Sequence, residues 1–490
     1  MRDPIARVWT AALFFVAGAA AASLLPTRLA VLGCLVGATG TFLRRRRLVA
    51  VLALAVLSFA AGSLDASLHN ASGAALETLA HGSPRCLLHG RVQEAMSPFG
   101  SLVRVGEIAC ADGVVSGGAL ALPLLTAPAG TRVDGSGWLI KPPQGMFEDV
   151  LRRNGASAAF QTSNLTTSGI SSPVFRLAAA IRGSLAAASS RLSPPESALL
   201  KGVAIGDTSD FDSRTLEDFR RSGLSHLLAV SGENLAMLMG AVAFAATRLA
   251  RKPRIFVMAL AAGTFVIVVG PQPSVLRAAV MAAIALGAMA AGRSADPLTA
   301  LGIAIVTVVA LRPGLVFSPG LQLSAAATAG IVIWTSRIAA RLSALPRPLA
   351  LGLAATTAAQ IAVAPLLVGL FGQISVIGVV ANLIALPAVP AATVLGLTAG
   401  TVGLFNASAA AVLAVVARPF VAWILWVAAR LGRPTWAAVA VPHWAGIPVA
   451  ALVVMWLLAG LRDPREPSPL SLSHVQLERR GSERHRDLDI

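Results

Sequence analysis

Tyrosine is absent from the 490-residue chain, and charged residues make up only 13% of it. A soluble globular protein carries about 25% charged residues, whereas 56% of this chain is hydrophobic. The composition therefore excludes an ordinary water-soluble enzyme. With only three cysteines, the chain also has too few thiols for a disulfide scaffold or a cysteine-rich metal site.

Carboxylates are missing from residues 297–461, which still contain seven arginines. Proton- and cation-coupled transporters generally rely on carboxylates within the membrane, and Glu233 is the single acid inside the predicted spans. The pattern argues against an ion-coupled solute carrier and is compatible with a path for an anion. Lipid-facing helices also avoid acids, so the pattern has a purely structural explanation as well.

The chain is rich in apolar runs, most of them about 17 residues or longer, which is enough to cross the hydrocarbon core of a bilayer. They predict a polytopic α-helical membrane protein with about 12 spans. The run at 376–405 contains Pro387 and Pro390, which predict a broken helix or a hairpin of shorter pieces. Gly396 and Gly400 have the spacing of closely packed helices. The predicted spans are 5–25, 27–43, 48–64, 224–249, 254–270, 274–292, 297–311, 320–341, 348–370, 376–405, 408–432 and 443–461.

Residues 65–172 differ from the rest, because no long apolar run survives and Gly, Pro, Ser and Thr increase. Short alternating segments at 86–94, 101–110, 131–141 and 156–162 predict a small β-rich, barrel-like (OB-like) domain. The net charge of this region is −1, so the basic footprint usual for nucleic-acid binding is missing. A structural or gating role is an equal alternative.

Two further segments are recognisable from their polarity. Residues 174–192 predict an amphipathic helix along the membrane surface, and another helix is expected from about 212. The charged residues after 461 predict a disordered tail. The predicted parts are N-terminal transmembrane helices 1–64, the β-rich domain 65–172, an interfacial helical segment 173–222, a transmembrane channel domain 223–461 and a cytoplasmic tail 462–490.

Loop charges predict the orientation in the cytoplasmic membrane, since cytoplasmic loops are enriched in Lys and Arg. The four arginines at 44–47 place both termini inside and the β-rich domain outside, and the later basic clusters agree. Outside the cytoplasm, Cys86 and Cys110 meet an oxidising compartment, and they lie on neighbouring predicted strands. We expect a disulfide that closes a loop of about 25 residues and contributes roughly 3 kcal/mol. Two unpaired buried cysteines are the alternative.

The most distinctive segment is 205–240, where a polar turn and an amphipathic helix lead directly into an apolar span. It resembles the core of the ComEC family of bacterial competence proteins, and the resemblance continues in order along the chain. The matching elements are 206–207 (GD), 219–224 (FRRSGL), 225–232 (SHLLAVSG), 273–278 (PSVLRA), 296–298 (DPL), 317–324 (FSPGLQLS), 359–360 (AQ) with Pro365 and 371–372 (FG), and 382–387 (NLIALP).

This resemblance implies a channel that conducts single-stranded DNA across the cytoplasmic membrane during natural transformation. The implied partners are single-stranded DNA, membrane lipids, an extracytoplasmic DNA receptor and a cytoplasmic helicase or motor, with a separate nuclease as a further candidate. Energy would come from a partner, because the chain contains no P-loop GxxxxGK[ST].

Two departures from the family pattern keep other functions open. Many relatives have Leu-His where this chain has Glu233 and Asn234, so no role of that histidine is transferred. Many relatives also carry a C-terminal metallo-β-lactamase-like domain, but no HxHxDH zinc pattern occurs here. We therefore predict no catalytic residues, metal, cofactor or nuclease activity. The alternatives are a transporter of another anionic polymer or lipid on the same scaffold, and a structural membrane component.

Candidate path residues are polar groups in or beside the spans. Guanidinium groups engage phosphates, although interfacial arginines also reach toward lipid headgroups. Uncharged polar side chains within spans either line a path or fasten helices together. The candidate DNA or anion path comprises Arg220, Arg221, Arg277, Ser231, Glu233, Asn234, Gln322, Ser324, Gln360 and Asn382. The candidate structural residues are Asp207 (an arginine partner or a turn cap), His226 (a hydrogen-bonded core residue), Pro273 (a helix start), and Pro365 and Pro387 (helix breaks).

Overall fold

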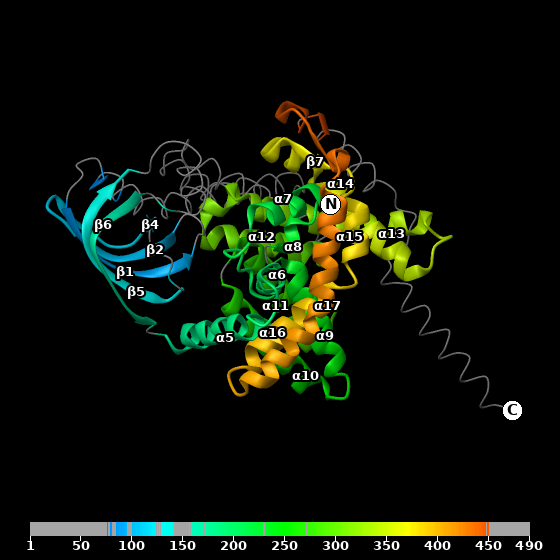
Figure 1. The fold of residues 1–490 in the computed structure, drawn as a ribbon, viewed down its shortest axis with the longest axis horizontal. Coiled ribbons are helices and arrows are strands. Elements are labelled where there is room, and N and C mark those ends of the chain that lie inside the picture. Colours follow the sequence, from blue (N-terminus) through cyan, green and yellow to red (C-terminus); the bar gives the residue numbers. More distant parts are fainter. Residues whose placement is uncertain are drawn as a thin grey trace, which may run out of the picture. The chain divides into compact units, whose positions relative to one another are not determined.

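The chain divides into two compact units, residues 1–325 with 375–438 and residues 326–374 with 439–490. The computed structural model (Figure 1) describes residues 76, 79–80, 85–95, 100–123, 125, 127, 129–141, 156, 158–170, 172–228, 231–270, 272–446 and 448–449. The predicted spans at 5–25, 27–43 and 48–64, most of 443–461 and the tail at 462–490 lie outside the described residues. The domain boundaries taken from the sequence remain predictions.

A barrel-like sheet forms the first part of the first unit (Figure 1). Its strands are β1 Arg85–Ala95, β2 Ser101–Cys110, β3 Gly113–Val115, β4 Ala119–Leu122, β5 Thr131–Ile140 and β6 Ala158–Ile170. The order is β1-β5-β6-β4-β2-β3, and β1 also pairs with β2, which closes five strands into a ring. Only β4 and β6 pair in parallel. The predicted barrel-like sheet is confirmed, but β3 and β4 were not expected, because strands of three and four residues are too short to show an alternating pattern.

Side-chain alternation fills the interior of this barrel with apolar groups. Leu88, Val103, Val133 and Phe160 are completely buried in its core, while Leu102 of β2 and Ala159 of β6 belong to a second, smaller buried cluster. Cys86 lies directly opposite Cys110 across β1 and β2. Their Cα atoms are 4.1 Å apart and the two residues form a disulfide, which confirms that prediction.

Three helices follow the barrel: α5 Pro173–Ser189, α6 Pro194–Ile205 and α7 Ser213–Ser222. α5 and α7 agree with the helices expected near 174–192 and from about 212. α6 was not predicted, because it is buried around almost its whole circumference and therefore shows no amphipathic period. Its start is fixed by a capping box, in which Ser193 and Glu196 satisfy each other's backbone N–H groups.

The remaining elements are mostly apolar helices. They are α8 Ser225–Leu228, α9 Gly232–Ala245, α10 Arg251–Val269, α11 Pro273–Ala290, α12 Pro297–Leu311, η1 Pro313–Phe317, α13 Pro319–Arg341, α14 Arg347–Phe371, β7 Gln373–Ser375, α15 Gly378–Ala385, α16 Val389–Val402, α17 Ala407–Gly432, η2 Thr435–Ala437, β8 Ala438–Ala440 and η3 His443–Ala445. Among the described residues, five helices are long and apolar enough to cross a membrane, namely α10, α11, α13, α14 and α17. The bent pair α15–α16 would make a sixth. The total of about 12 spans remains a prediction.

Two sequence expectations about breaks in the helices were wrong. The run at 224–249 is not one helix, because α8 ends at Leu228 and α9 begins only at Gly232. Pro365 does not break its helix either, since α14 continues through it, which neighbouring groups allow in membrane helices. Pro387 does fall in the break between α15 and α16, which are bent by 53°. Pro273 occupies the first turn of α11, where its missing N–H costs nothing.

α16 packs closely against α5 and α6 within the first unit. A Cβ on Gly396 would lie 2.8 Å from the Cβ of Ala204, and one on Gly400 would lie 3.1 Å from Ile181. These distances leave no room for a side chain on α16, so the Gly396/Gly400 spacing does indicate close helix packing, as expected. α17 lies beside α16 (Figure 1) and completes the largest apolar core of the molecule.

The second unit contains most of α13 together with α14 and η3. Ala350, Ala354 and Ala358 form a buried stripe of small side chains along α14, and Trp334 of α13 is buried. Gln360 lies half-buried on α14, so this path candidate belongs to the second unit.

Candidate functional site

The break before α9 brings several predicted residues of the first motif together. Ser231 is the N-cap of α9, and its hydroxyl accepts a hydrogen bond from the backbone N–H of Glu233 at 3.2 Å. Asn234 is 2% exposed, and its Nδ2 donates to the carbonyl of Val203 in α6 at 3.0 Å. The Glu233 side chain is exposed. Asn234 therefore fastens α9 to α6, and Glu233 is the polar group that this turn leaves accessible.

Arg277 of α11 lies against the same turn and is 5% exposed. Its Nε donates to the hydroxyl of Ser324 at 3.1 Å, and its Nη1 lies 3.3 Å from the sulfur of Met281. A Cβ at Gly232 would come within 2.6 Å of its Nη2. The glycine that starts α9 therefore provides the space in which the guanidinium sits, where α9, α11 and the second turn of α13 meet.

Two of the predicted amides hold helix ends in place. Nε2 of Gln322 donates to the carbonyl of Val316 in η1 at 2.9 Å. Nδ2 of Asn382 donates to the carbonyl of Gly378 at 2.8 Å and lies 3.4 Å from that of Gly223. Gln322 and Asn382 therefore fasten helix ends, which is one of the two roles expected for polar groups within apolar segments.

The loop before α7 is built by carboxylates. Asp207 accepts hydrogen bonds from the backbone N–H of Ser209 at 3.1 Å and from its hydroxyl at 2.6 Å, so it caps a turn. Asp212 is the N-cap of α7 and accepts from the backbone N–H of Thr215 at 2.8 Å. Hydrogen bonds from the Thr215 hydroxyl and backbone hold the pKa of the Asp212 carboxyl below its ordinary range. His226 lies exposed on α8, and the expectation of a core position for it was wrong.

The two arginines at the end of α7 have different surroundings. Arg220 is exposed, and its Nε and Nη2 donate to both carboxylate oxygens of Glu217 at 2.8 and 3.0 Å. This pairing holds the pKa of Glu217 below its ordinary range. Arg221 is half-buried and donates from Nη2 to the carbonyl of Pro434 at 2.7 Å. Its buried Nε has no hydrogen-bond partner among the described residues.

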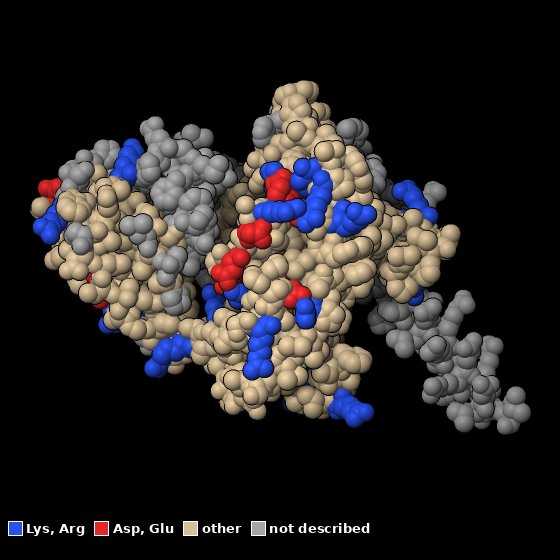
Figure 2. Space-filling model, in the orientation of Figure 1, with Lys and Arg blue, Asp and Glu red and all other residues tan. Residues whose placement is uncertain are grey.

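Further contacts attach the end of α7 to segments distant in sequence. Asp218 is 9% exposed and pairs with Nε of Arg433 at the end of α17 at 3.4 Å. The hydroxyl of Ser375, just before α15, donates to the carbonyl of Arg221 at 2.8 Å. Acidic and basic side chains gather over α7 and its surroundings in Figure 2, while most of the remaining helical surface in that view is uncharged.

The structure therefore sorts the path candidates of the first unit, apart from Gln322, into two groups. Ser231 is the N-cap of α9, Glu233 and Asn234 lie in its first turn, and Arg277 contacts the same turn at Gly232 and reaches Ser324. Arg220, Arg221 and Asn382 gather at the end of α7. Sequence reasoning missed Asp218 and Arg433, although a carboxylate on the apolar side of an amphipathic helix is a recognisable sign of a buried ion pair.

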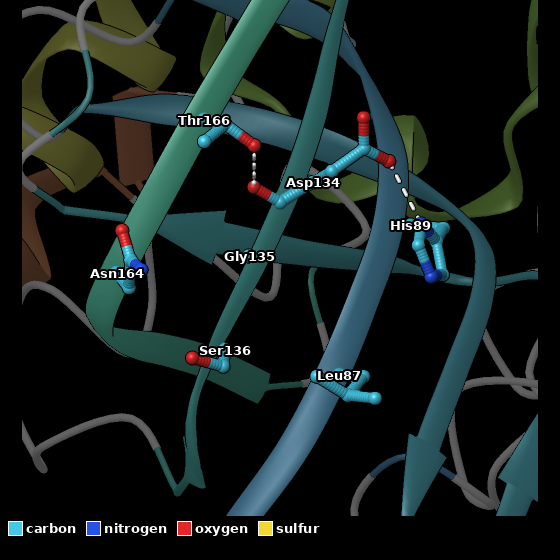
Figure 3. Close-up of a pocket in the computed structure, with 7 residues that line it drawn as sticks. All are labelled: Leu87, His89, Asp134, Gly135, Ser136, Asn164 and Thr166. Atoms are coloured by element: carbon cyan, nitrogen blue, oxygen red, sulfur yellow. Dashed lines mark hydrogen bonds and ion pairs between the residues drawn. The ribbon is translucent and has the colours of Figure 1, made fainter.

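A pocket of about 230 Å³ lies on the outer face of the barrel. In Figure 3, Nδ1 of His89 points toward the Asp134 carboxylate, 2.8 Å away, and the Thr166 hydroxyl donates to the Asp134 carbonyl at 2.9 Å. Within the residues that the structure describes, no three His, Cys, Asp or Glu side chains are grouped so as to hold a metal ion.

Comparison with known proteins supports the sequence motifs. The profile of the family described as "Competence: Competence protein" matches residues 203–465, more than half of the chain. "ComE operon protein 3" of Bacillus subtilis (strain 168) is 26% identical over 197 residues, which cover 40% of this chain and 25% of that relative. The match thus spans a quarter of the relative's length. No solved structure matches the chain. The apolar helices fit a membrane protein, and the chain belongs to the competence protein family.

Proposed function

We propose that this protein conducts single-stranded DNA inward across the cytoplasmic membrane during natural transformation. The observation that carries the proposal is the family match over 203–465, which contains both the turn before α9 and the spans that follow it. The relative's printed name refers to a competence operon. We place the barrel outside the membrane and both termini in the cytoplasm, following the loop charges.

The two groups of polar residues have different proposed roles along the path. Arg220 is exposed at the end of α7, so its guanidinium can exchange Glu217 for a phosphate. Arg221 still has one buried donor without a partner among the described residues. Arg277 is enclosed, and its role is to keep the entry turn in shape while its positive charge favours an anion nearby.

The acid-free stretch supports an anionic cargo. No carboxylate occurs in residues 297–461, and seven arginines do. A polyanion crossing these helices would therefore meet cationic contacts and no fixed negative charge to repel it. Because each cationic contact would be transient, binding would stay weak enough for movement. An extracytoplasmic receptor would deliver the strand and a cytoplasmic helicase or motor would pull it. A separate nuclease would remove the second strand.

Transformation of a deletion strain tests the proposal. We expect loss of labelled DNA entry on deletion, and a drop of at least about tenfold with Arg220→Glu, which turns a phosphate contact into repulsion. Arg214→Glu is the matched control, because Arg214 is exposed on the same helix. At the enclosed site, Arg277→Gln removes the positive charge, whereas Arg277→Lys keeps the charge and removes the planar guanidinium group. Comparing DNA entry in these two variants separates the effect of charge from that of shape. Undiminished entry of labelled DNA into the deletion strain would refute the proposal.

The second candidate is transport of another anionic polymer or lipid. It is favoured by Glu233 and Asn234, which replace the usual residues of the first motif. Normal DNA entry combined with an altered envelope lipid or polymer content in the deletion strain would select this candidate instead.

A further inference from the structure

Three arginines on neighbouring strands lie side by side on the outer face of the barrel. Arg91 of β1 is directly opposite Arg132 of β5 on one side and directly opposite Arg104 of β2 on the other. All three side chains are exposed. Neighbouring strands are about 4.8 Å apart, so the three positions span about 10 Å across the sheet. This arginine row (Arg132, Arg91 and Arg104) was hidden in the sequence, because the three residues are separated along the chain.

The row is electrostatically unfavourable in the absence of a ligand. Like charges directly opposite each other on a sheet destabilise the pairing. Among the described residues, none of the three arginines forms an ion pair or a hydrogen bond. A bound polyanion would relieve the repulsion between these arginines, because each of its adjacent phosphates would contact one guanidinium group.

The nearest carboxylates do not neutralise the row. Asp134 and Glu107 lie two to three residues further along β5 and β2, on either side of His89. Asp134 is hydrogen-bonded to His89 in Figure 3. The outer face therefore carries a cationic row beside an acidic one. The net charge of −1 for residues 65–172 conceals this segregation, which corrects the inference that the domain has no basic footprint.

An aromatic platform stands further along the same face. Trp138 of β5 is 41% exposed, and Cζ of Arg85 on β1 lies 6.0 Å from its ring. Arg85 and Arg91 are six residues apart on β1, which places this platform about 20 Å from the arginine row. Unpaired bases stack on exposed aromatic rings, whereas a duplex or a simple polyphosphate offers no free base.

We propose that the outer face formed by β5, β1 and β2 binds single-stranded nucleic acid, with its phosphates on the arginine row and a base on Trp138. The inference rests on the proposed function and names a contact surface for that strand. Asp134 and Glu107 lie between these two contacts and repel phosphates, so the strand touches the face at the arginine row and at Trp138 and not at the centre between them.

Equilibrium binding of a labelled 30-nucleotide single strand to the purified full-length protein in nanodiscs tests the surface. The triple variant Arg91→Ser, Arg104→Ser, Arg132→Ser should bind at least about tenfold more weakly at low salt. Its slope of log affinity against log salt should fall by about 2, since each single-strand phosphate contact contributes about 0.7. The matched control, Arg176→Ser, Arg191→Ser, Arg248→Ser, removes the same charge from exposed positions elsewhere and should leave the slope unchanged.

The thermal stability of the triple variant shows whether the three arginines bind a ligand or support the fold of the barrel. Removing three opposed like charges should leave the thermal unfolding midpoint of the barrel unchanged or raise it, whereas loss of structural residues would lower it. Trp138→Ala should weaken binding of the single strand about tenfold and leave binding of inorganic polyphosphate unchanged.

Three results would overturn the surface: an unchanged salt slope in the triple variant, an equal change in the control, or a Trp138→Ala loss that is the same for both polyanions. These results do not depend on transformation. A deletion strain that still takes up DNA would instead refute the channel function while leaving the binding measurement interpretable.

Discussion

At the scale of single residues, Gly232 explains how a buried arginine fits beside a helix start. The glycine is the first residue of α9, and the guanidinium of Arg277 occupies the volume that a side chain would take. Sequence similarity alone identified both positions as family motif residues, but it did not indicate that they touch. Their contact depends on the extended backbone of Ser231, where α9 begins within an apolar run that looks continuous.

We expect Gly232→Ala to destabilise the protein by about 1–3 kcal/mol, the usual cost of overpacking. The new Cβ would lie 2.6 Å from Nη2 of Arg277 and 2.9 Å from the Cβ of Ala278, so α9 and α11 would have to separate. Gly240→Ala on the same helix is the control, because nothing lies within 4 Å of that position. The free energy of unfolding of both variants is measured in mixed micelles. Equal values for the two variants would contradict the contact.

Asn234 shows how far the sequence could go at the residue scale. Its unusual identity within the motif was evident, and a role facing a cavity was one interpretation of a polar group there. The structure buries it against α6, where its amide satisfies the Val203 carbonyl. A sequence cannot distinguish these outcomes, because both place a hydrogen-bonding group inside an apolar span.

At the scale of elements, α7 is a short amphipathic helix whose stability comes from its ends. Asp212 caps its start, and Asp218 and Arg221 attach its end to residues that follow α17 by one or two positions. The sequence predicted α7 because its polar period and its cap are local signals. It did not predict α6, which lacks a polar face, or the continuity of α14 through Pro365, which depends on the surrounding helices.

The Asp218–Arg433 pair should be needed to hold α7 in place. Arg433→Ala leaves the Asp218 carboxylate buried without its partner, and we expect a loss of about 1–3 kcal/mol of stability. Adding Asp218→Asn to this variant should recover part of the loss, because the neutral amide costs less to bury. Arg430→Ala, at an exposed position one turn earlier, is the control. Thermal unfolding of the wild type, the Arg433→Ala and Asp218→Asn single variants and the double variant gives the coupling energy of the pair, and a coupling of zero would exclude it.

The cap of α7 should make its stability depend on pH. The pKa of Asp212 lies below its ordinary value of 3.8 in the folded protein, so the folded state favours the carboxylate. Its stabilising contribution is therefore present above about pH 4 and is lost as the pH falls through the lowered pKa. The difference in thermal midpoint between wild type and Asp212→Ala should stay constant from pH 6 to about pH 4 and shrink as the pH falls further. A difference independent of pH would show that the charge of the cap has no role.

At the scale of the whole molecule, the barrel and the helices differ in how well a sequence reports them. Apolar length gave the positions of the five long apolar helices that the structure describes, because membrane helices must satisfy their own backbone groups. Alternation located four strands, which are 10 to 13 residues long in the structure, although β6 continues to Ile170, well beyond the predicted segment 156–162. The order in which the strands pair was not predictable from the sequence. The arginine row on the outer face was therefore not predictable either, because it forms only when β1 lies between β2 and β5.

The disulfide should stabilise the barrel without affecting the helices. Cys86 and Cys110 are 24 residues apart, and closing such a loop contributes roughly 3 kcal/mol. We expect Cys86→Ser with Cys110→Ser to lower the resistance of the barrel to proteolysis, as reducing agent should do for the wild type. Helical unfolding, followed by circular dichroism, should be unaffected. Equal protease resistance with and without reducing agent would contradict a stabilising bond.

Closure of the sheet has a consequence for the behaviour of the protein outside the lipid. Because β1 pairs with both β5 and β2, β1 has no free edge, whereas β6 joins β4 only through Ala158 and Ala159 and is otherwise paired on its β5 side alone. The one strand beyond the ring is β3, which is three residues long. Open edges are the usual starting points of aggregation. Among the described strands, the unpaired side of β6 is therefore where copies of this barrel could join outside the lipid, whereas β1 and β5 are paired on both sides.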